Sequence, residues 1–360
     1  MAKILLFSDI HVHNHKKSYE RLDDCIKAFE WIFETARENN IKSIIFGGDL
    51  LHERQKIDSC VYQNIYNVLK NNQEFDLYLL LGNHDIWFNE KTDISGVYPF
   101  ESLKGVKVIG KPQTLEIEGS LWDFLPFTHD PIESLNKFNK KGIDKRYLIG
   151  HISIDGAVLN SGGQISDVIV EHDGEMVKVS ENLFANYKYA FFGHYHKAQK
   201  IGKNVEYIGS PLELSFGEAG EEKHVIVFDT ETCKRKYIVN HFSPKHIYVY
   251  QENIKELEKE VIENNFVCIL SEDLSSPEAK ENANYLKENF SPQSLQFKKF
   301  TSKKEEKKDK KKFEEIKFVL NDDKKMIEKY IEQYNSKNLN VEILNEIGKL
   351  ILEKANSSDK

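Results

Sequence analysis

The stretch KILLFSDIH at Lys3–His11 decides the fold, because a strand-length apolar run leads directly into Asp9 and His11. Two similar combinations follow, SIIFGGD at Ser43–Asp49 and LYLLLGNHD at Leu77–Asp85. Uninterrupted apolar runs indicate strands buried on both faces, as in a sheet covered by helices. The carboxyl ends of such strands lie at one edge of the sheet, so we expect their polar residues to meet there.

Helical spacing of apolar residues separates these runs and predicts helices over Arg21–Asn39 and Ser59–Asn71. The strands between them are predicted at Lys3–Ser8, Ser43–Phe46 and Leu77–Leu81. Further runs lie closer together and predict a second, more antiparallel sheet packed on the first: Val106–Ile109, Gln113–Ile117, Leu121–Leu125, Tyr147–Ile149, Tyr189–Phe192, Val205–Ile208 and His224–Phe228. The fold class is therefore α/β, with two packed sheets.

Length and composition narrow the class of protein. A chain of 360 residues exceeds what one hydrophobic core usually spans, so two or more domains are expected. The 50 Lys+Arg and 58 Asp+Glu residues give a net charge of −8, so contact with nucleic acid needs a local basic surface or bound cations. Scattered cysteines, and the lack of a signal peptide or a membrane-length apolar run, predict a soluble intracellular chain with no membrane contact.

The pattern changes at Ser243-Pro244, and we predict four segments. Residues 1–243 form the α/β domain. Residues 244–301 form a small α+β module, with strands Ile247–Tyr250, Phe266–Leu270 and Ser294–Phe297 and helices Ile254–Glu263 and Pro277–Asn289. Residues 302–320 begin with the Lys-rich stretch Ser302–Lys312, which is either a solvated linker or a DNA contact. Residues 321–360 hold amphipathic helices at Asp322–Tyr334 and Val341–Leu352, which either dock on a partner or fold back on the body.

Two further clusters repeat the pattern of the first three, Gly150-His151 and Gly193–His196, each after an apolar run. One histidine of this kind is more often structural than functional, but five clusters in order, each after a strand, are poorly explained by chance. Seven ligands without a thiolate suit two ions of the Mn²⁺, Fe²⁺, Zn²⁺ or Mg²⁺ type sharing a bridging carboxylate. They are Asp9, His11, Asp49, Asn83, His151, His194 and His196.

The ordered set resembles the calcineurin-like metallophosphoesterase superfamily, whose two-sheet sandwich is flanked by helices. Within it, SDIH at Ser8–His11, GGDLLH at Gly47–His52 and IGSPLELSFGE at Ile208–Glu218 are similar to the SbcD-type DNA repair nucleases. These include the archaeal and eukaryotic Mre nucleases and phage recombination endonuclease subunits. The motifs cover Lys3 to Phe242, and beyond that the resemblance rests on layout alone.

The resemblance implies roles for the site residues. Asp9, His11 and His196 would hold one ion, Asn83, His151 and His194 the second, and Asp49 would bridge them. His84 would protonate the leaving sugar oxygen. Asp85 would orient His84 or cap a helix, and His52 would contact substrate. His13 and His15 follow the first cluster, and each either contacts the substrate phosphate or is an exposed loop residue.

The same resemblance implies a function and partners. The chain would be the two-metal nuclease subunit of a DNA repair and recombination complex, a 3′–5′ exonuclease on duplex ends and an endonuclease on single strands. Mn²⁺ would support it, with Mg²⁺ as the alternative. The C-terminal helices would bind an SbcC or Rad-type coiled-coil ATPase, and the 244–301 module would be a DNA-binding cap. A homodimer through helices near Lys56–Leu69 and after Asp85 would complete a heterotetramer in the bacterial or phage-infected cytoplasm, although the periodicity of these helices equally suits ordinary core-facing helices.

Two rival functions remain open at the level of sequence. One is a stand-alone phosphodiesterase for small phosphoesters, which would need neither the module nor the C-terminal helices. The other is a non-catalytic scaffold with a relic site, against which the intact ligand set and His84 argue.

Overall fold

The structure, a computed structural model, describes residues 2–14, 18–88, 91–159, 165–274, 277–299 and 317–319. The Lys-rich stretch Ser302–Lys312, the helices predicted beyond Asp322, and His15 lie outside these residues. No helix within the described ranges is long and apolar enough to cross a membrane.

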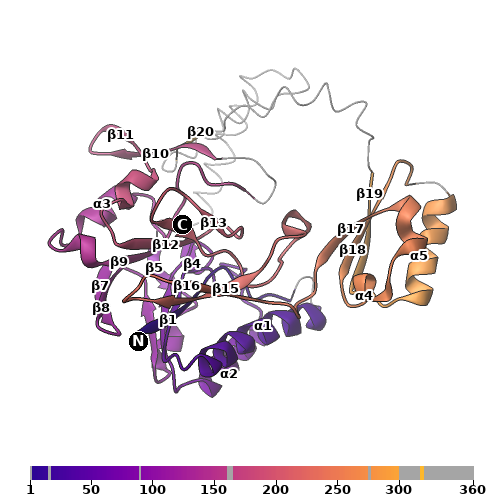
Figure 1. Ribbon diagram of the computed structural model, residues 1–360, viewed down its shortest axis with the longest axis horizontal. Coiled ribbons are helices and arrows are strands. Elements are labelled where there is room, and N and C mark those ends of the chain that lie inside the picture. Colours follow the sequence, from indigo (N-terminus) through magenta and orange to yellow (C-terminus); the bar gives the residue numbers. More distant parts are fainter. Residues whose placement is uncertain are drawn as a thin grey trace, which may run out of the picture.

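The first sheet has six strands in the order β16-β15-β1-β2-β3-β6. Its parallel strands are β1 (Lys3–Phe7), β2 (Ser43–Phe46), β3 (Asp76–Leu80) and β6 (Val106–Ile109), and β15 (His224–Asp229) and β16 (Arg235–Val239) add an antiparallel edge. Helices α1 (Tyr19–Glu38) and α2 (Ser59–Asn71) cover its outer face (Figure 1). Each begins at a side-chain cap, Ser18 or Asp58.

Burial in β1 confirms the prediction of strands covered on both sides. Leu5 and Phe7 pack with the helices, whereas Ile4 and Leu6 belong to the core between the two sheets. That inner core combines Ile and Leu side chains with aromatic rings, which include Trp122, Tyr147, Phe191 and Phe228.

The second sheet also has six strands, in the order β13-β14-β12-β9-β8-β7. The strands are β7 (Gln113–Ile117), β8 (Ser120–Leu125), β9 (Tyr147–His151), β12 (Tyr189–Gly193), β13 (Gln199–Lys200) and β14 (Val205–Tyr207). The prediction of a more antiparallel sheet is wrong, because β8, β9, β12 and β14 are parallel neighbours and only the edge strands run the other way. Long connections through α3 (Pro131–Asn136) and the 152–188 region permit these parallel crossovers.

Two runs assigned to the second sheet belong to the first. Val106–Ile109 pairs parallel with β3, and His224–Asp229 pairs antiparallel with β1. Close spacing along the chain does not determine which sheet a strand joins.

Smaller elements complete the body. The hairpin β10 (Ser166–His172) and β11 (Glu175–Lys178) packs beside α3, and β20 (Lys317–Val319) pairs with β10. The hairpin β4 (Ile86–Phe88) and β5 (Lys91–Ser95) follows Asp85, where the resemblance implied a helix. The remaining single turns are η1 (Tyr98–Ser102), η2 (Ile143–Lys145), η3 (Glu181–Phe184) and η4 (Phe216–Glu218).

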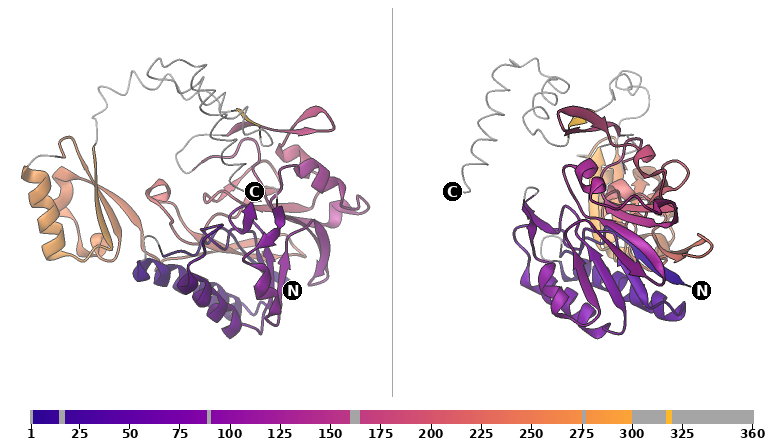
Figure 2. Two further views of the ribbon diagram at one scale, coloured as in Figure 1. Left: turned by 180° about the vertical axis from the view of Figure 1, so that it is seen from behind. Right: turned by 90° about the vertical axis from the view of Figure 1, so that its left-hand side faces the viewer.

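Residues His246–Lys299 contain a separate parallel sheet of β17 (His246–Tyr250), β18 (Phe266–Ser271) and β19 (Ser294–Lys299). Helix α5 (Pro277–Asn289) covers one face of it, and its small core includes Val249, Ile269 and Leu286. Figure 2 shows this module beside the N-terminal end of α1. Gln293 of the module donates to the Asp24 carboxylate of α1 at 3.0 Å.

The prediction of one helix over Ile254–Glu263 is wrong in part. The structure has η5 (Gln251–Glu256) and a four-residue α4 (Lys259–Ile262), separated by extended backbone at Leu257 and Glu258. A short helix is marginal without tertiary support, and neighbouring glutamates weaken it further. Ile254 and Ile262 nevertheless reach the module core.

Candidate metal centre

The seven predicted ligands meet at the carboxyl ends of five strands. Asp9 follows β1, Asp49 follows β2 and Asn83 follows β3, three parallel neighbours in the first sheet. His151 ends β9 and His194 follows β12, which are parallel neighbours in the second sheet. Both sheets therefore supply side chains to one place.

A first group of donors consists of Asp9, His11 and His196, whose ligand atoms all lie within 4.8 Å of one another. His11 Nε2 and His196 Nε2 are 3.1 Å apart. Ligands bonded to one ion at about 2.0–2.1 Å lie about 3 Å apart, so two facing imidazole nitrogens at this distance fit a shared cation. The backbone N–H of His194 donates to both Asp9 carboxylate oxygens, at 2.9 and 3.1 Å, and fixes that carboxylate.

A second group consists of Asp49, His151 and His194, again within 4.8 Å. Asn83 joins it, since its Oδ1 lies 3.1 Å from His151 Nε2 and 3.0 Å from His194 Nδ1. Asp49 Oδ2 lies 3.3 Å from His151 Nε2 and 3.4 Å from His11 Nε2. One carboxylate oxygen thus faces both groups, as a bridging ligand must.

Electrostatics in this buried cluster favour cations. Burial holds the pKa of His11 well below its usual value, and burial together with the nearby His151 lowers the pKa of His194 to about 3. Both rings are therefore neutral near pH 7, the form that ligates metals. Burial opposes charge on His151, but Asp49 beside it raises the pKa of that ring to about 9. A metal ion would displace this proton on binding.

The backbone around the ligands is constrained. Asp9, His11, Asp49 and His194 have φ values of 52°, 44°, 63° and 97°, the left-handed region that side chains other than glycine seldom adopt. Such conformations persist where surrounding structure enforces them, often at functional sites. Gly48, at φ 105°, packs so closely that a Cβ there would lie 2.3 Å from His151 Nδ1.

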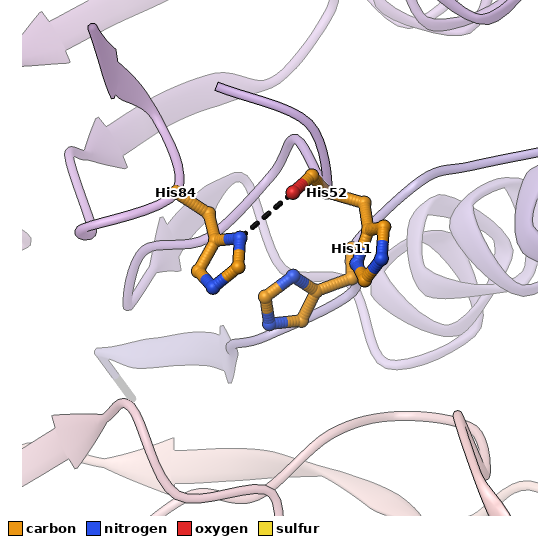
Figure 3. A group of neighbouring side chains, drawn as sticks. All are labelled: His11, His52 and His84. Atoms are coloured by element: carbon orange, nitrogen blue, oxygen red, sulfur yellow. Dashed lines mark hydrogen bonds between the residues drawn. The ribbon is translucent and has the colours of Figure 1, made fainter. Parts of the chain in front are cut away.

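A third group, drawn in Figure 3, joins His11, His52 and His84 with ring nitrogens within 4.8 Å of one another. His84 is half-buried, and its Nδ1 lies 2.7 Å from the His52 carbonyl oxygen. A carbonyl can only accept, so Nδ1 carries the proton of this bond.

Asp85 is arranged differently from its predicted orienting role. Its carboxylate accepts backbone N–H bonds from Asp49 at 2.8 Å, Gly82 at 2.9 Å and Leu51 at 3.0 Å. The alternative role as a helix cap is wrong, because β4 follows it. Asp85 thus organises the loops that carry Asp49 and Asn83, and the His52 carbonyl orients His84.

His13 is buried, not exposed, and its Nδ1 lies 2.6 Å from the backbone oxygen of His11. A cavity of about 330 Å³ adjoins His52, lined among others by His13, Asn14 and Lys56. The two histidines predicted to contact substrate therefore border a space that opens beside the third group.

Sequence reasoning assigned no chemistry to Glu218 and Lys223. Glu218, with 0% of its surface exposed, lies 2.8 Å from His196 Nδ1 and 2.7 Å from Lys223 Nζ. Burial opposes the charge of Glu218, but the His196 bond and the Lys223 charge lower its pKa to about 2. The only signal in the sequence was the motif IGSPLELSFGE, which does not show that its last acid reaches a ligand twenty-two residues earlier.

Three relatives of this chain are named as subunits of nucleases or exonucleases. Exonuclease subunit 1 of Enterobacteria phage T4 is 25% identical over 223 residues, 60% of this chain and 61% of that protein, so the chain spans less than two thirds of this relative. The SbcD subunit of the nuclease SbcCD from Escherichia coli is 27% identical over 274 residues, 66% of this chain and 67% of that protein. The corresponding subunit from Staphylococcus saprophyticus is 22% identical over 316 residues, 79% and 77% of the two chains.

A profile of the calcineurin-like phosphoesterase family matches residues 2–198. The matched segment runs from β1 past His196 and holds all seven predicted ligands and His84. It covers more than half of the 360 residues. The chain belongs to the calcineurin-like phosphoesterase family.

Proposed function

We propose that this chain is the two-metal nuclease subunit of a DNA repair or recombination complex. The observation that carries the proposal is Asp49 Oδ2, which faces the Asp9 group and the His151 group at once, with the His84 ring beside them. Relatives named as nuclease and exonuclease subunits support DNA as the substrate.

The family uses divalent metal ions, and the donor set fits two of them. Asp9, His11 and His196 would hold one, and Asn83, His151 and His194 the other, with Asp49 between. We propose Mn²⁺, since mixed carboxylate, amide and imidazole ligands without thiolate suit it, with Mg²⁺ as the alternative. Bound ions supply an activated water and the positive charge that receives a phosphodiester.

The chain's own residues would position the phosphodiester and donate a proton to its leaving oxygen. In its doubly protonated form, with Nδ1–H bonded to the His52 carbonyl, His84 would give its Nε2 proton to the leaving 3′-oxygen as a general acid. His52 and His13 line the adjoining cavity and would contact the strand next to the scissile phosphate. Since the chain carries a net charge of −8, the ions would supply much of the attraction for DNA.

The remaining segments complete the proposal. Residues 1–243 would be the nuclease domain and 244–301 a DNA-binding cap. Residues 302–320 would be a charged linker to partner-binding helices in 321–360. The partner would be an SbcC or Rad-type coiled-coil ATPase, as the names of the relatives suggest. Two copies of each chain would form a heterotetramer in the bacterial or phage-infected cytoplasm, and the enzyme would cut duplex ends 3′ to 5′ and single strands internally.

The test is cleavage of end-labelled duplex and circular single-stranded DNA by the full chain with Mn²⁺, with and without the ATPase partner. His84→Gln should bind DNA and Mn²⁺ as wild type does but cut about 10²–10⁴-fold more slowly. His241→Gln, at an exposed histidine of the same chain, is the matched control and should cut normally.

Other outcomes separate the rivals. DNA left intact while a small phosphodiester is hydrolysed would replace the nuclease with a small-molecule phosphodiesterase. Wild-type cleavage rates in His84→Gln would overturn the role of His84. Loss of partner binding on truncation after Leu320, with Mn²⁺ binding retained, would support the C-terminal docking segment.

A further inference from the structure

Two buried carboxylates lie close together in the connection between β14 and β15. Glu213 and Glu218 are 1% and 0% exposed. Burying a carboxylate is costly unless it is hydrogen-bonded or paired, so each must have specific partners. Their partners lie in different directions, one toward the metal centre and one toward the 244–299 module. We call residues Ser210–Glu218, which carry both acids, the coupling segment.

The first end of the coupling segment holds the metal ligand His196. Glu218 Oε1 accepts from His196 Nδ1 at 2.8 Å, and Oε2 accepts from Ser210 Oγ at 3.1 Å and from the Leu214 N–H at 3.2 Å. Because the carboxylate accepts, the proton of the ring lies on Nδ1 and the Nε2 lone pair faces His11. Carboxylates that bond the far nitrogen of a histidine ligand fix its tautomer and orientation in this way.

Lys223 also holds Glu218 and His196 in place. Its Nζ lies 2.7 Å from Glu218 Oε2 and donates to the His196 backbone oxygen at 3.0 Å. The Ser210 N–H donates to that oxygen as well, at 3.0 Å. Both the ring and the backbone of His196 are thus held by the coupling segment and by its buried counter-charge.

The second end holds the first strand of the module. A Glu213 carboxylate oxygen accepts from the backbone N–H of His246, where β17 begins, and the Glu213 backbone oxygen accepts from Arg21 of α1 at 2.8 Å. The Phe216 ring lies 4.9 Å from the His246 ring and 5.3 Å from the Tyr248 ring. The coupling segment therefore contacts β17 through a charged and an aromatic side chain.

We propose that Glu218 is a positioning residue for His196 and that the coupling segment makes metal affinity depend on its own contact with β17. Between Phe216 and Glu218 the chain forms the single turn η4, so a shift of Phe216 moves Glu218 directly. The inference rests on the metal centre of the proposed function, but neither on DNA as the substrate nor on cleavage.

The test measures the affinity of both Mn²⁺ ions for the full chain, by the electron paramagnetic resonance signal of free Mn²⁺. Glu218→Gln should lower the affinity for one of the two Mn²⁺ ions about 10–100-fold. This variant should fold, because Lys223 keeps Glu221 as a partner at 2.9 Å. Phe216→Ala keeps every hydrogen bond of the coupling segment. It should lower the affinity for the same Mn²⁺ ion by about two- to thirtyfold.

Gln293→Ala is the matched control, because it breaks a different contact between module and body, at Asp24, without touching the coupling segment. It should bind both ions as wild type does. Wild-type affinity in Phe216→Ala, or an equal loss in Gln293→Ala, would overturn the coupling. Equal weakening of both ions in Glu218→Gln would show a general disturbance of the fold and overturn the positioning role. Each comparison keeps its meaning if wild type binds Mn²⁺ but cuts no DNA, a result that would refute the proposed function alone.

Discussion

Gly82 lies between β3 and Asn83, and the space beside its Cα is already occupied. A Cβ there would lie 2.1 Å from Asp49 Oδ1 and 2.5 Å from Asp49 N. Gly82→Ala should therefore displace the Asp49 carboxylate, the proposed bridge, and lower Mn²⁺ affinity and hydrolysis by about a hundredfold, as a misplacement near 1 Å can. Gly174→Ala is the control for backbone strain away from the site, because its φ is 79° but its Cβ would meet nothing within 4 Å. Unchanged Mn²⁺ binding in Gly82→Ala would show that Asp49 does not bridge.

A substitution at Asp85 can show whether this carboxylate supports the loops of the site or acts directly on His84. Its carboxylate accepts three backbone N–H bonds, so Asp85→Asn places an NH₂ group against donors and leaves at least one buried N–H unpaired. We expect a loss of about 1–3 kcal/mol in the free energy of unfolding, together with weaker Mn²⁺ binding. Denaturant unfolding and metal titration measure both quantities. A shifted pH–rate profile with unchanged stability would instead support a direct action on His84.

The sequence predicted which side chains gather at the site, but not how they support one another. Each predicted ligand follows an apolar run, and neighbouring parallel strands bring their carboxyl ends together. The partners of Asp85 are backbone groups, which leave no mark on a sequence. Glu218 reaches His196 only because the connection between β14 and β15 folds back, and no local pattern distinguishes this acid from others nearby.

Elements were predictable where a local pattern determines them. β2, α2 and α5 begin and end at the predicted residues, since apolar runs and helical spacing are local. The direction of β9 and β12 depends on the long connections before them, and for that reason the second sheet was predicted wrongly. The placement of β15 in the first sheet depends on pairing with β1, some two hundred residues earlier in the chain.

β15 also carries a titratable group with consequences for stability. His224 at its start is buried against the Tyr237 ring, 4.8 Å away, and neither of its ring nitrogens is hydrogen-bonded. Burial lowers its pKa, so the native ring stays neutral while the unfolded ring takes a proton below its ordinary value of 6.5. Its contribution to stability is complete above that pH and is lost as pH falls through the native pKa.

His224→Phe should reduce this loss. We expect the melting temperature of the variant to fall less between pH 7 and pH 5, by an amount equivalent to at most about 1.4 kcal/mol per pH unit. Thermal unfolding of wild type, His224→Phe and the exposed-site control His241→Phe at matched pH values measures it. Parallel curves for wild type and His224→Phe would show that the buried ring does not govern acid stability.

At the scale of the molecule, the proposed metal centre lies where the two sheets meet. The first sheet supplies Asp9, His11, Asp49 and Asn83, and the second supplies His151, His194 and His196. Without metal, the sheets are joined by the aromatic core around Trp122 and Phe191 and by the hydrogen bonds among the ligands. Bound ions would therefore cross-link the two sheets.

This arrangement predicts that metal removal destabilises the whole sandwich. Adding Mn²⁺ to one hundred times its dissociation constant should stabilise the native chain by about 2.7 kcal/mol per site, and EDTA should reverse the shift. Asn83→Ala in the first sheet and His151→Ala in the second should each remove much of this Mn²⁺-dependent gain in stability. Each variant deprives the ion that the two residues would share of one ligand. Thermal unfolding with and without Mn²⁺ gives the comparison, and His241→Gln should show the full rise. A full rise in His151→Ala would place the stabilising ion in one sheet alone, and the two-sheet metal centre would have to be abandoned.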